Sequence, residues 1–464
     1  MDIAEIGTAI GGAIGDIMRN KSIFKKKTCI LIAVVMLTTV FVGCTSQKTV
    51  NDKELTVYYV KGTSYYSTVL DTYDNLDDNV KLNCVEFQTE DEMTNKLATE
   101  MAAGAGPDVV LLSSKTTLDI DKSIKGDNFA DLTSNFADDS SYSADNYFKN
   151  IIDGVEVSGK QYIVPLTFDL TTYNMKKSVR DKLQLGKLDT SLNYGDFMNT
   201  VLSYQEQLQS DDNMELTLSA MSSNGTLMST AKTCGLKVID ENGQICISKN
   251  DFQLTFSIIK SMQNELLKKQ ATLKANATGR EAYGYYDTYF YKGNIATETA
   301  FLNAILSGTK FNDSLVFQGI PNIGGDGGYN ANVTTYGVVN SKSINIQQSY
   351  KLLRFMMDYN FKSEYINECF SINKIVFADI LDKIKLGYEK YTISSTEQYT
   401  SLPWDNELSD SFNYMMEHIT TASVSNSKVW EIIQNIMQGY LDGTDSFDTC
   451  YDKMINQLNL YLQE

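Results

Sequence analysis

Alternating strand-like and helix-like segments place the tightest limit on the fold of this chain. Residues 55–60 and 80–87 have strand-like patterns, and residues 65–76 between them have a helical one. Thr89-Glu90-Asp91-Glu92 is a capping box, which predicts the start of another helix. Residues 108–112 follow as an unbroken apolar run, typical of a strand that is buried on both faces of a sheet. Three strand–helix steps within about 60 residues predict an α/β sheet.

The N-terminal region has the pattern of a secretory signal peptide. Five basic residues between positions 19 and 27 precede an apolar run over residues 29–42. This run has 14 residues, whereas a permanent membrane-spanning helix needs about 20, so we expect it to be removed.

The end of this apolar run, Phe41-Val42-Gly43-Cys44, resembles the lipobox of bacterial lipoproteins. The resemblance implies that Cys44 is acylated and becomes the first residue of the mature chain. Residues 1–43 are then an N-terminal extension and signal peptide, and residues 44–54 are a polar tether. The alternative is ordinary secretion, with Cys44 as a free thiol.

The composition argues against several classes of partner. The chain has 58 Asp and Glu against 40 Lys and Arg, a net charge of −18 at pH 7, so nucleic acid is a poor partner. The seven cysteines include no CxxC pair, and the single histidine, His418, cannot build a His-based metal site. We therefore expect no metal and no other cofactor. Cys234 and Cys246 are close enough for a local disulfide, and the alternative is that the cysteines are buried free thiols.

Short motifs follow one another in a characteristic order between residues 55 and 464. In the first, Gly104-Ala105-Gly106-Pro107-Asp108 joins a helix to a strand. The others are Gly159-Lys160-Gln161-Tyr162-Ile163-Val164-Pro165-Leu166, Tyr173-Asn174, Tyr291-Lys292-Gly293-Asn294-Ile295-Ala296, Gly319-Ile320-Pro321, and residues 336–342, 349–359 and 443–462. This order resembles that of the family 1 extracellular solute-binding proteins.

The resemblance implies a two-lobed, periplasmic-binding-protein-like α/β fold with a hinge between the lobes. Lobe 1 would contain residues 55–165 and 322–365, and lobe 2 residues 166–321 and 366–464. The resemblance also implies a monomer, without enzymatic activity, that is lipid-anchored on the extracytoplasmic face of the membrane. Its partners would be a small solute, foremost a mono- or oligosaccharide, and the permease of an ABC importer. Ligands of open α/β sheets bind beyond the carboxyl ends of strands, which agrees with a site between the lobes.

Polar and aromatic residues near the predicted strand ends are candidates for contacts with the solute. They are Tyr59, Ser113, Ser114, Phe168, Asp169, Glu298, Tyr336 and Trp404. Trp404 follows Pro403 in a polar loop, where an aromatic ring can stack on the apolar face of a sugar. For each of the others, core packing or a capped turn is an equally good interpretation. Trp430 lies in a predicted amphipathic helix with Ile433 and Met437, so we expect it in the core.

Two further stretches look like chemical motifs but favour simpler roles. Residues 323–328 are glycine-rich but lack the Lys and Ser/Thr of a phosphate-binding loop, which predicts a turn. Residues 442–448 are acidic but lack the spacing of an EF-hand, so Asp445 or Ser446 is expected to cap a helix.

Two other functions compete with solute capture. One is a cell-surface carbohydrate-active enzyme, in which Asp169 and Glu298 would form the carboxylate pair. The other is an adhesive or scaffolding lipoprotein. Turnover of a substrate would identify the enzyme, and failure to bind any small solute would favour the adhesive protein.

Overall fold

A computed structural model of the chain begins with the alternation that the sequence predicts. The residues that it describes are 54–62, 64–76, 80–177, 181, 194–197, 199–200, 203, 235–240, 243–270, 290–294, 315–323, 328–359, 370–385, 390–394, 397–400 and 405–463. The first elements are β1 (Glu54–Val60), α2 (Ser64–Asp74), β2 (Lys81–Phe87), α3 (Glu90–Ala102) and β3 (Val109–Ser113). Each strand and helix predicted between residues 55 and 112 is therefore confirmed.

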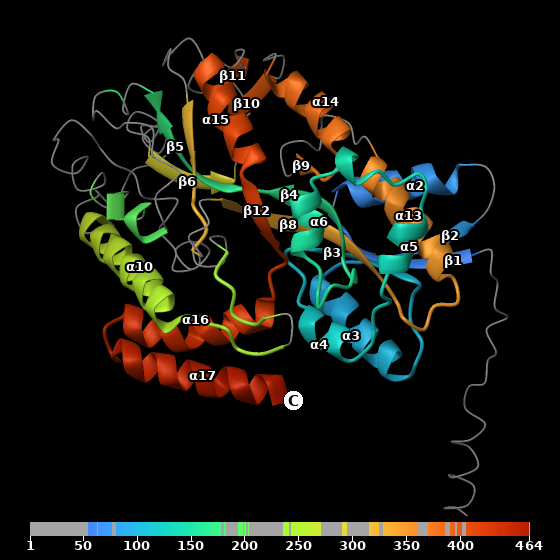
Figure 1. The fold of residues 1–464 in the computed structure, drawn as a ribbon, viewed down its shortest axis with the longest axis horizontal. Helices are drawn as coiled ribbons and strands as arrows, with labels where there is room; N and C mark the ends of the chain where they lie inside the picture. The colour runs from blue at the N-terminus through green and yellow to red at the C-terminus, as the bar shows by residue number, and fades with distance from the viewer. Residues whose placement is uncertain are drawn as a thin grey trace, which may run out of the picture. The chain divides into compact units, whose positions relative to one another are not determined.

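The main sheet mixes parallel and antiparallel pairs around one long strand. Its other strands are β4 (Val164–Asp169), β8 (Tyr329–Val339), β9 (Phe370–Ser371) and β12 (Ile419–Ser423). The strand order is β2-β1-β3-β8-β4-β9, and β12 also pairs with β8 (Figure 1). β1 is parallel to β2 and β3, and β12 is parallel to β8, whereas β8 is antiparallel to β3 and β4. Three segments that are far apart in the sequence therefore meet on β8.

The remaining elements are mostly helices. Before β8 they are α4 (Ile120–Lys125), α5 (Thr133–Asp138), η1 (Ala144–Asn146), α6 (Lys149–Gly154), β5 (Thr171–Lys176), α10 (Lys249–Gln270), β6 (Phe290–Asn294) and β7 (Leu315–Gly319). After β8 they are α13 (Ile346–Asp358), α14 (Lys374–Lys385), β10 (Lys390–Ser394), β11 (Glu397–Thr400), α15 (Asn406–Glu417), α16 (Ser427–Leu441) and α17 (Phe447–Gln463).

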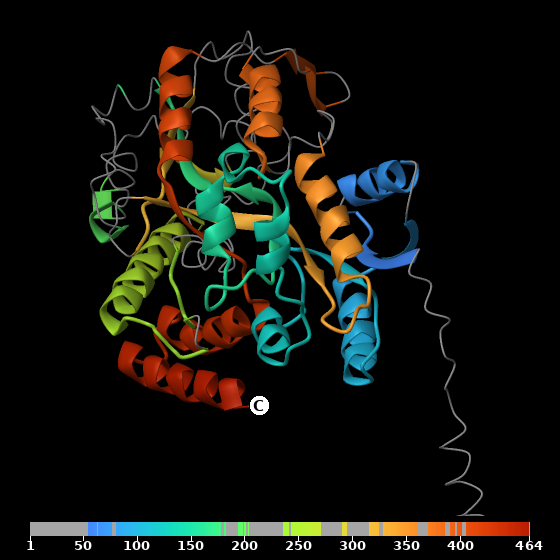
Figure 2. The same ribbon diagram turned by 45° about the vertical axis from the view of Figure 1, so that its right-hand side comes forward.

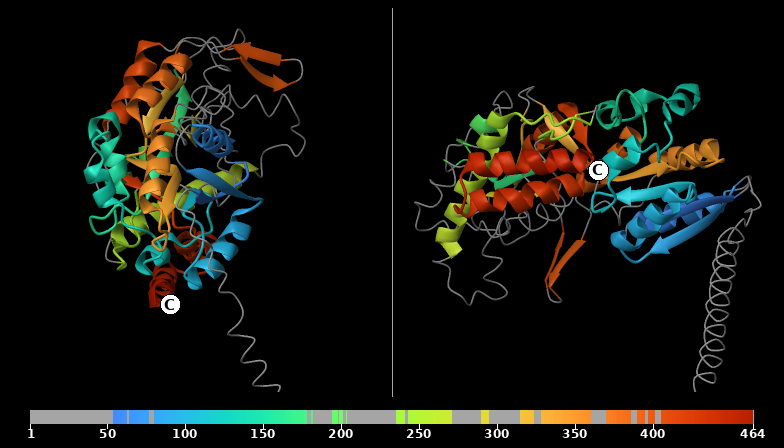
Figure 3. Two further views of the ribbon diagram at one scale, coloured as in Figure 1. Left: turned by 90° about the vertical axis from the view of Figure 1, so that its right-hand side faces the viewer. Right: turned by 90° about the horizontal axis from the view of Figure 1, so that it is seen from below.

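These elements also form smaller units. β5 pairs antiparallel with both β6 and β7, and β10 pairs antiparallel with β11. α16 and α17 run side by side, as Figure 3 shows from two directions.

Buried apolar side chains form two separate clusters. The first draws on the main sheet and on α2, α3, α13, α14 and α15. The second draws mainly on α10, α16 and α17. The described chain passes from one cluster to the other after Leu170, after Ile320 and after Ala422. The buried residues between positions 370 and 422 belong to the first cluster, whereas the predicted lobe 2 contains them, and the division into lobes stays a prediction.

Side chains cap the helices much as the sequence predicts. The Thr89 hydroxyl accepts a hydrogen bond from the Glu92 N–H at 3.2 Å, and the Glu92 carboxylate accepts one from the Gln88 N–H at 3.1 Å. The capping box is thus present, with its second bond made to Gln88. At the start of α17 the Ser446 hydroxyl accepts from the Thr449 N–H at 3.2 Å, which confirms the expected cap.

Three cysteines and the single histidine lie among the described residues. Cys450 is buried, but Cys84 and Cys246 are exposed, so the expectation of buried thiols holds only for Cys450 among these three. Cys234 and residues 324–327 lie outside the described residues. His418 follows α15, and its ring stacks on that of Tyr414 with centroids 3.8 Å apart.

The described part of the chain holds no metal-binding cluster and no membrane-spanning helix. No group of three or more His, Cys, Asp or Glu side chains there is placed to hold a metal ion. Likewise, none of the helices within the described ranges combines the length and apolarity needed to cross a bilayer.

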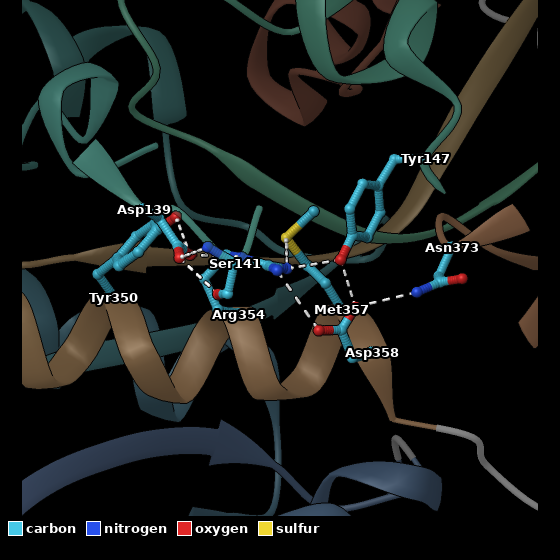
Figure 4. A network of polar contacts seen from close by, with 8 residues as sticks. All are labelled: Asp139, Ser141, Tyr147, Tyr350, Arg354, Met357, Asp358 and Asn373. Carbon is cyan, nitrogen blue, oxygen red and sulfur yellow. Dashed lines mark hydrogen bonds and ion pairs between the residues drawn. The ribbon is translucent and has the colours of Figure 1, made fainter. Parts of the chain in front are cut away.

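A buried arginine on α13 joins this helix to the loop that follows α5. Arg354 Nε lies 3.1 Å from Asp139 Oδ2, and Arg354 Nη2 lies 3.4 Å from Asp358 Oδ2 (Figure 4). The Tyr350 hydroxyl donates to Asp139 Oδ2 at 3.0 Å. Burial disfavours the charged form of Asp139, but hydrogen bonds from Ser141, Tyr350 and Arg354 outweigh it and lower the pKa of Asp139 to about 2.

Candidate functional site

A cavity of about 950 Å³ lies where β4, β8 and β12 meet the first turn of α16. Its walls also include parts of α4 and α6 and the segment 235–240. Cavities that hold small ligands typically measure about 300–1,000 Å³, so this one is large enough for a solute of several rings.

A row of polar side chains on β8 forms one wall of this cavity. Asn330, Asn332 and Thr334 all line it, and they stand at alternate positions of the strand. Alternate residues of a strand point to the same face, which explains why these three act together. Ala331 and Val333, which lie between them, point the other way and are buried in the first cluster. We call Asn330, Asn332 and Thr334 the polar row.

Hydrogen bonds from neighbouring strands hold the polar row in place. The Asn330 amide donates to the Ser423 hydroxyl at 3.0 Å, and the Thr421 hydroxyl donates to Asn330 Oδ1 at 3.1 Å. The Asn332 amide contacts the hydroxyl of Thr171, the first residue of β5, at 3.5 Å. Amide groups that are fixed in this way present their remaining donors and acceptors in defined directions.

The charged residues of the wall are mostly acidic, and α16 adds an aromatic residue. The described lining residues include five carboxylates and a single basic residue, Lys237, and the carboxylates are Asp121, Asp153, Glu156, Asp169 and Asp240. Such a wall disfavours anionic solutes. Burial raises the pKa of Asp121, although a hydrogen bond from Asn426 partly counteracts this. Trp430, which is 8% exposed, and Val429 supply an apolar surface from α16.

A glycine allows α6 to approach β12 closely at the edge of the cavity. A Cβ atom on Gly154 would lie 2.7 Å from the Ala422 backbone nitrogen, which is closer than real contacts allow. Both residues line the cavity, and Figure 2 shows α6 beside β12. Any larger residue at position 154 would push this wall outward.

Solved structures with similar folds are solute-binding proteins. The sugar-binding protein MalE from Xanthomonas citri matches with a TM-score of 0.61 and 12% identity, over 88% of this chain and 97% of that one. An extracellular solute-binding protein of family 1 from Alicyclobacillus acidocaldarius matches with a TM-score of 0.55 and 12% identity, over 89% of this chain and 98% of that one. The ABC transporter associated binding protein of B. animalis subsp. lactis was solved with β-1,6-galactobiose. It matches with a TM-score of 0.52 and 14% identity, over 89% of this chain and 98% of that one. This chain has the two-lobed solute-binding fold.

The match rests on structure alone. No protein-family model matches the chain, and no curated protein sequence matches it. The predicted fold class is confirmed, and the resemblance to family 1 holds at the level of the fold.

Within the solute-binding fold, two of the predicted contact residues line the cavity. Asp169 ends β4, is 5% exposed, and pairs in register with Asn332 of the polar row. Ser114 follows β3, and its N–H donates to the Thr334 carbonyl at 2.8 Å. The carboxyl end of β4 and the loop after β3 therefore reach the same cavity.

Four other predicted contact residues do not line this cavity. The Tyr59 hydroxyl donates to Glu86 of β2 at 3.3 Å, and Ser113 donates to Glu90 at 2.8 Å. The pKa of Tyr59 is raised to about 12, mainly because the side chain is buried and also because the Glu86 carboxylate is close. Phe168 and Tyr336 are fully buried in the first cluster. Glu298, Trp404 and Cys44 lie outside the described residues, so their roles stay predictions.

The cavity also contains residues that the sequence argument did not select. The polar row could have been found from the alternation of Asn330, Asn332 and Thr334 with Ala331 and Val333, which is typical of a half-exposed strand. Trp430 was likewise not predicted to contact the solute. It belongs to the second cluster, as expected from its helix, but it also lines the cavity.

Proposed function

We propose that this chain is the solute-binding component of an ABC importer and that its cavity holds a carbohydrate. The observation that carries the proposal is the combination, in one cavity, of the Trp430 ring with the polar row of β8. The fold supports it too, because the similar solved structures include proteins that are named as sugar-binding. The protein acts as a monomer on the extracytoplasmic face of the membrane.

The chemistry of a sugar matches this combination. A sugar ring has C–H faces that are poorly hydrated and hydroxyl edges that need hydrogen-bond partners. The exposed part of Trp430 offers an apolar surface for the first, and amides and hydroxyls of the polar row offer donors and acceptors for the second. Asp169 adds a carboxylate, a strong acceptor for sugar hydroxyls.

The position of the cavity suggests how capture works. Trp430 belongs to the second buried cluster, while most of the strand that carries the polar row belongs to the first. A solute in contact with both would draw the two clusters together, and hinge closure would shield it from water. The closed form is then the one that the permease recognises.

A ligand screen by thermal shift tests the proposal. We expect the soluble chain that begins at Asn51 to melt at a higher temperature with one or more members of a panel of neutral mono-, di- and trisaccharides. A ligand at 100 times its dissociation constant stabilises the folded state by about 2.7 kcal/mol. The ligand should be recovered unchanged, because the proposed role is binding and not turnover.

Three outcomes of the screen would revise the proposal. A response to peptides or polyamines but not to sugars would change the ligand class. Conversion of a sugar to products would favour the carbohydrate-active enzyme. No response to any small solute would favour the adhesive or scaffolding lipoprotein.

We also propose that Cys44 carries the lipid that anchors the chain. Cys44→Ala should move the protein from the membrane fraction to the soluble fraction, because two or more acyl chains are needed for stable anchoring and none could be attached. Ligand affinity should not change, since position 44 precedes all described elements. Membrane fractionation after a high-salt wash measures the first effect. A variant that stays membrane-bound would show that the lipobox is not functional.

A further inference from the structure

The segment around α4 contacts the beginning of α16 and the end of α17. Ile120 and Ile124 of α4 are buried in the first cluster, whereas Trp430 and Tyr461 belong to the second. Figure 2 shows α4 beside the C-terminal end of α17, and Lys125 donates to the Leu462 carbonyl there at 3.1 Å. Side chains therefore join the two clusters directly at this point, in addition to the chain crossings.

Asn426, the residue before α16, takes part in two kinds of contact: it bonds to α4 and it caps α16. Its amide nitrogen donates to Asp121 Oδ2 at 2.6 Å. The same residue caps α16, because its Oδ1 accepts from the N–H groups of Lys428 and Val429 at 3.1 and 3.3 Å. One side chain thus fixes the start of α16 and ties it to α4.

Neighbouring bonds reinforce this contact. The Tyr461 hydroxyl donates to Asp119 Oδ2 at 2.6 Å, and the Asn426 amide lies 3.2 Å from that hydroxyl. The Ser427 hydroxyl donates to the Thr116 carbonyl at 3.0 Å. Two carboxylates on the α4 side thus face an amide and a hydroxyl from α16 and α17, so that donors and acceptors are matched.

These bonds lie at the cavity itself. Asp121 and Ile124 line it from the α4 side, and Asn426 and Trp430 line it from the α16 side. Separating α4 from α16 would therefore widen the cavity and move Trp430 away from the opposite wall. It would also leave the Asp121 carboxylate without its amide donor, which is costly for a partly buried group.

We propose that Asn426 is a positioning residue that latches the two sides of the cavity together through Asp121. This inference rests on the proposed function, because a latch has a purpose only if the cavity closes on a solute. Asn426 supplies the donor, Asp119 and Asp121 are the acceptors, and Tyr461 supports the group from α17. The latch stabilises the arrangement in which Trp430 is held against a bound ligand.

The decisive variant is Asn426→Asp. Aspartate is as good a helix cap as asparagine, so α16 keeps its cap. The new carboxylate, however, replaces the amide donor and repels Asp119 and Asp121. We expect small-angle X-ray scattering of the ligand-free protein to give a larger radius of gyration than for the wild type, with an unchanged helical circular dichroism spectrum. Asn426→Ser, which also caps helices, replaces the amide donor by a shorter hydroxyl without adding charge and should give a smaller increase.

A polarity swap tests the pairing itself. In Asp121→Asn combined with Asn426→Asp, the amide and the carboxylate exchange sides, and we expect the radius of gyration to return toward the wild-type value. Equal scattering from all variants, or no recovery in the swap, would overturn the latch. The measurement uses no ligand, so failure of the carbohydrate screen would refute the proposed function without obscuring this result.

Discussion

Replacing Trp430 by alanine is expected to weaken carbohydrate binding by up to about tenfold. Trp430 is only 8% exposed, so a ligand can cover only a small part of its apolar surface, and about 1.4 kcal/mol, a factor of ten in affinity, is the most that we expect this contact to contribute. Trp430 is the large aromatic residue among the described lining of the cavity, so its loss removes the stacking surface. Titration calorimetry with the best carbohydrate of the screen measures the effect.

A matched variant separates this effect from a general loss of stability. Trp430 is also part of the second cluster, so its truncation removes core packing as well. Ile433 is fully buried on the same helix and does not line the cavity. Ile433→Ala should lower the free energy of unfolding by about 2–5 kcal/mol but leave the dissociation constant of the folded protein unchanged. Equal loss of affinity in both variants would mean that Trp430 acts only through packing.

Replacing Arg354 by methionine is expected to lower the free energy of unfolding by about 3–5 kcal/mol. Removing one partner of a buried ion pair leaves the other charge uncompensated, and here that charge is on Asp139. Lys428→Met is the control, because the Lys428–Glu431 pair is half-exposed and should contribute less than about 1 kcal/mol. Urea denaturation at neutral pH measures both. Similar losses would show that the arginine network adds no more than a surface pair.

The same variant has a predicted pH dependence. Asp139 has a pKa of about 2 in the folded protein, whereas an unperturbed aspartate in the unfolded chain titrates near about 3.9. A folded pKa that is lowered contributes stability above the unfolded pKa, and this contribution is lost as the pH falls toward the folded pKa. Arg354 supplies part of this lowering, besides Ser141 and Tyr350, so the difference in the free energy of unfolding between wild type and Arg354→Met should narrow between about pH 4 and pH 2 without vanishing. A constant difference over this range would contradict the role given to Asp139.

The sequence predicted the first strands and helices because their signals are local. Hydrophobic period, a capping box and a glycine after a helix are set by neighbouring residues, and all three occur before position 112. The pairing of β12 with β8 and of β9 with β4 joins segments far apart in the chain, and no local pattern encodes it. The same long-range pairing brings Phe370 and Phe412 into the first cluster.

The cavity was predicted only in part, for a related reason. Asp169 and Ser114 follow strands that the sequence reveals, so their place at strand ends could be inferred. Phe168 precedes Asp169 by one residue and therefore points to the opposite face of β4, into the core. Trp430 has the helical spacing of a core residue and is one, and the cavity beside it arises only when α16 meets β12 and α4.

Fluorescence of single-tryptophan variants tests the central claim most directly. The chain has two tryptophans, so Trp404→Phe leaves Trp430 as the only indole reporter, and Trp430→Phe leaves Trp404. Each variant is titrated with the carbohydrate that raises the melting temperature most in the screen. We predict that the emission of Trp430 changes saturably, with the dissociation constant that calorimetry gives for the same variant. Unchanged emission from Trp430, while calorimetry still detects binding and Trp404 responds, would place the ligand outside this cavity.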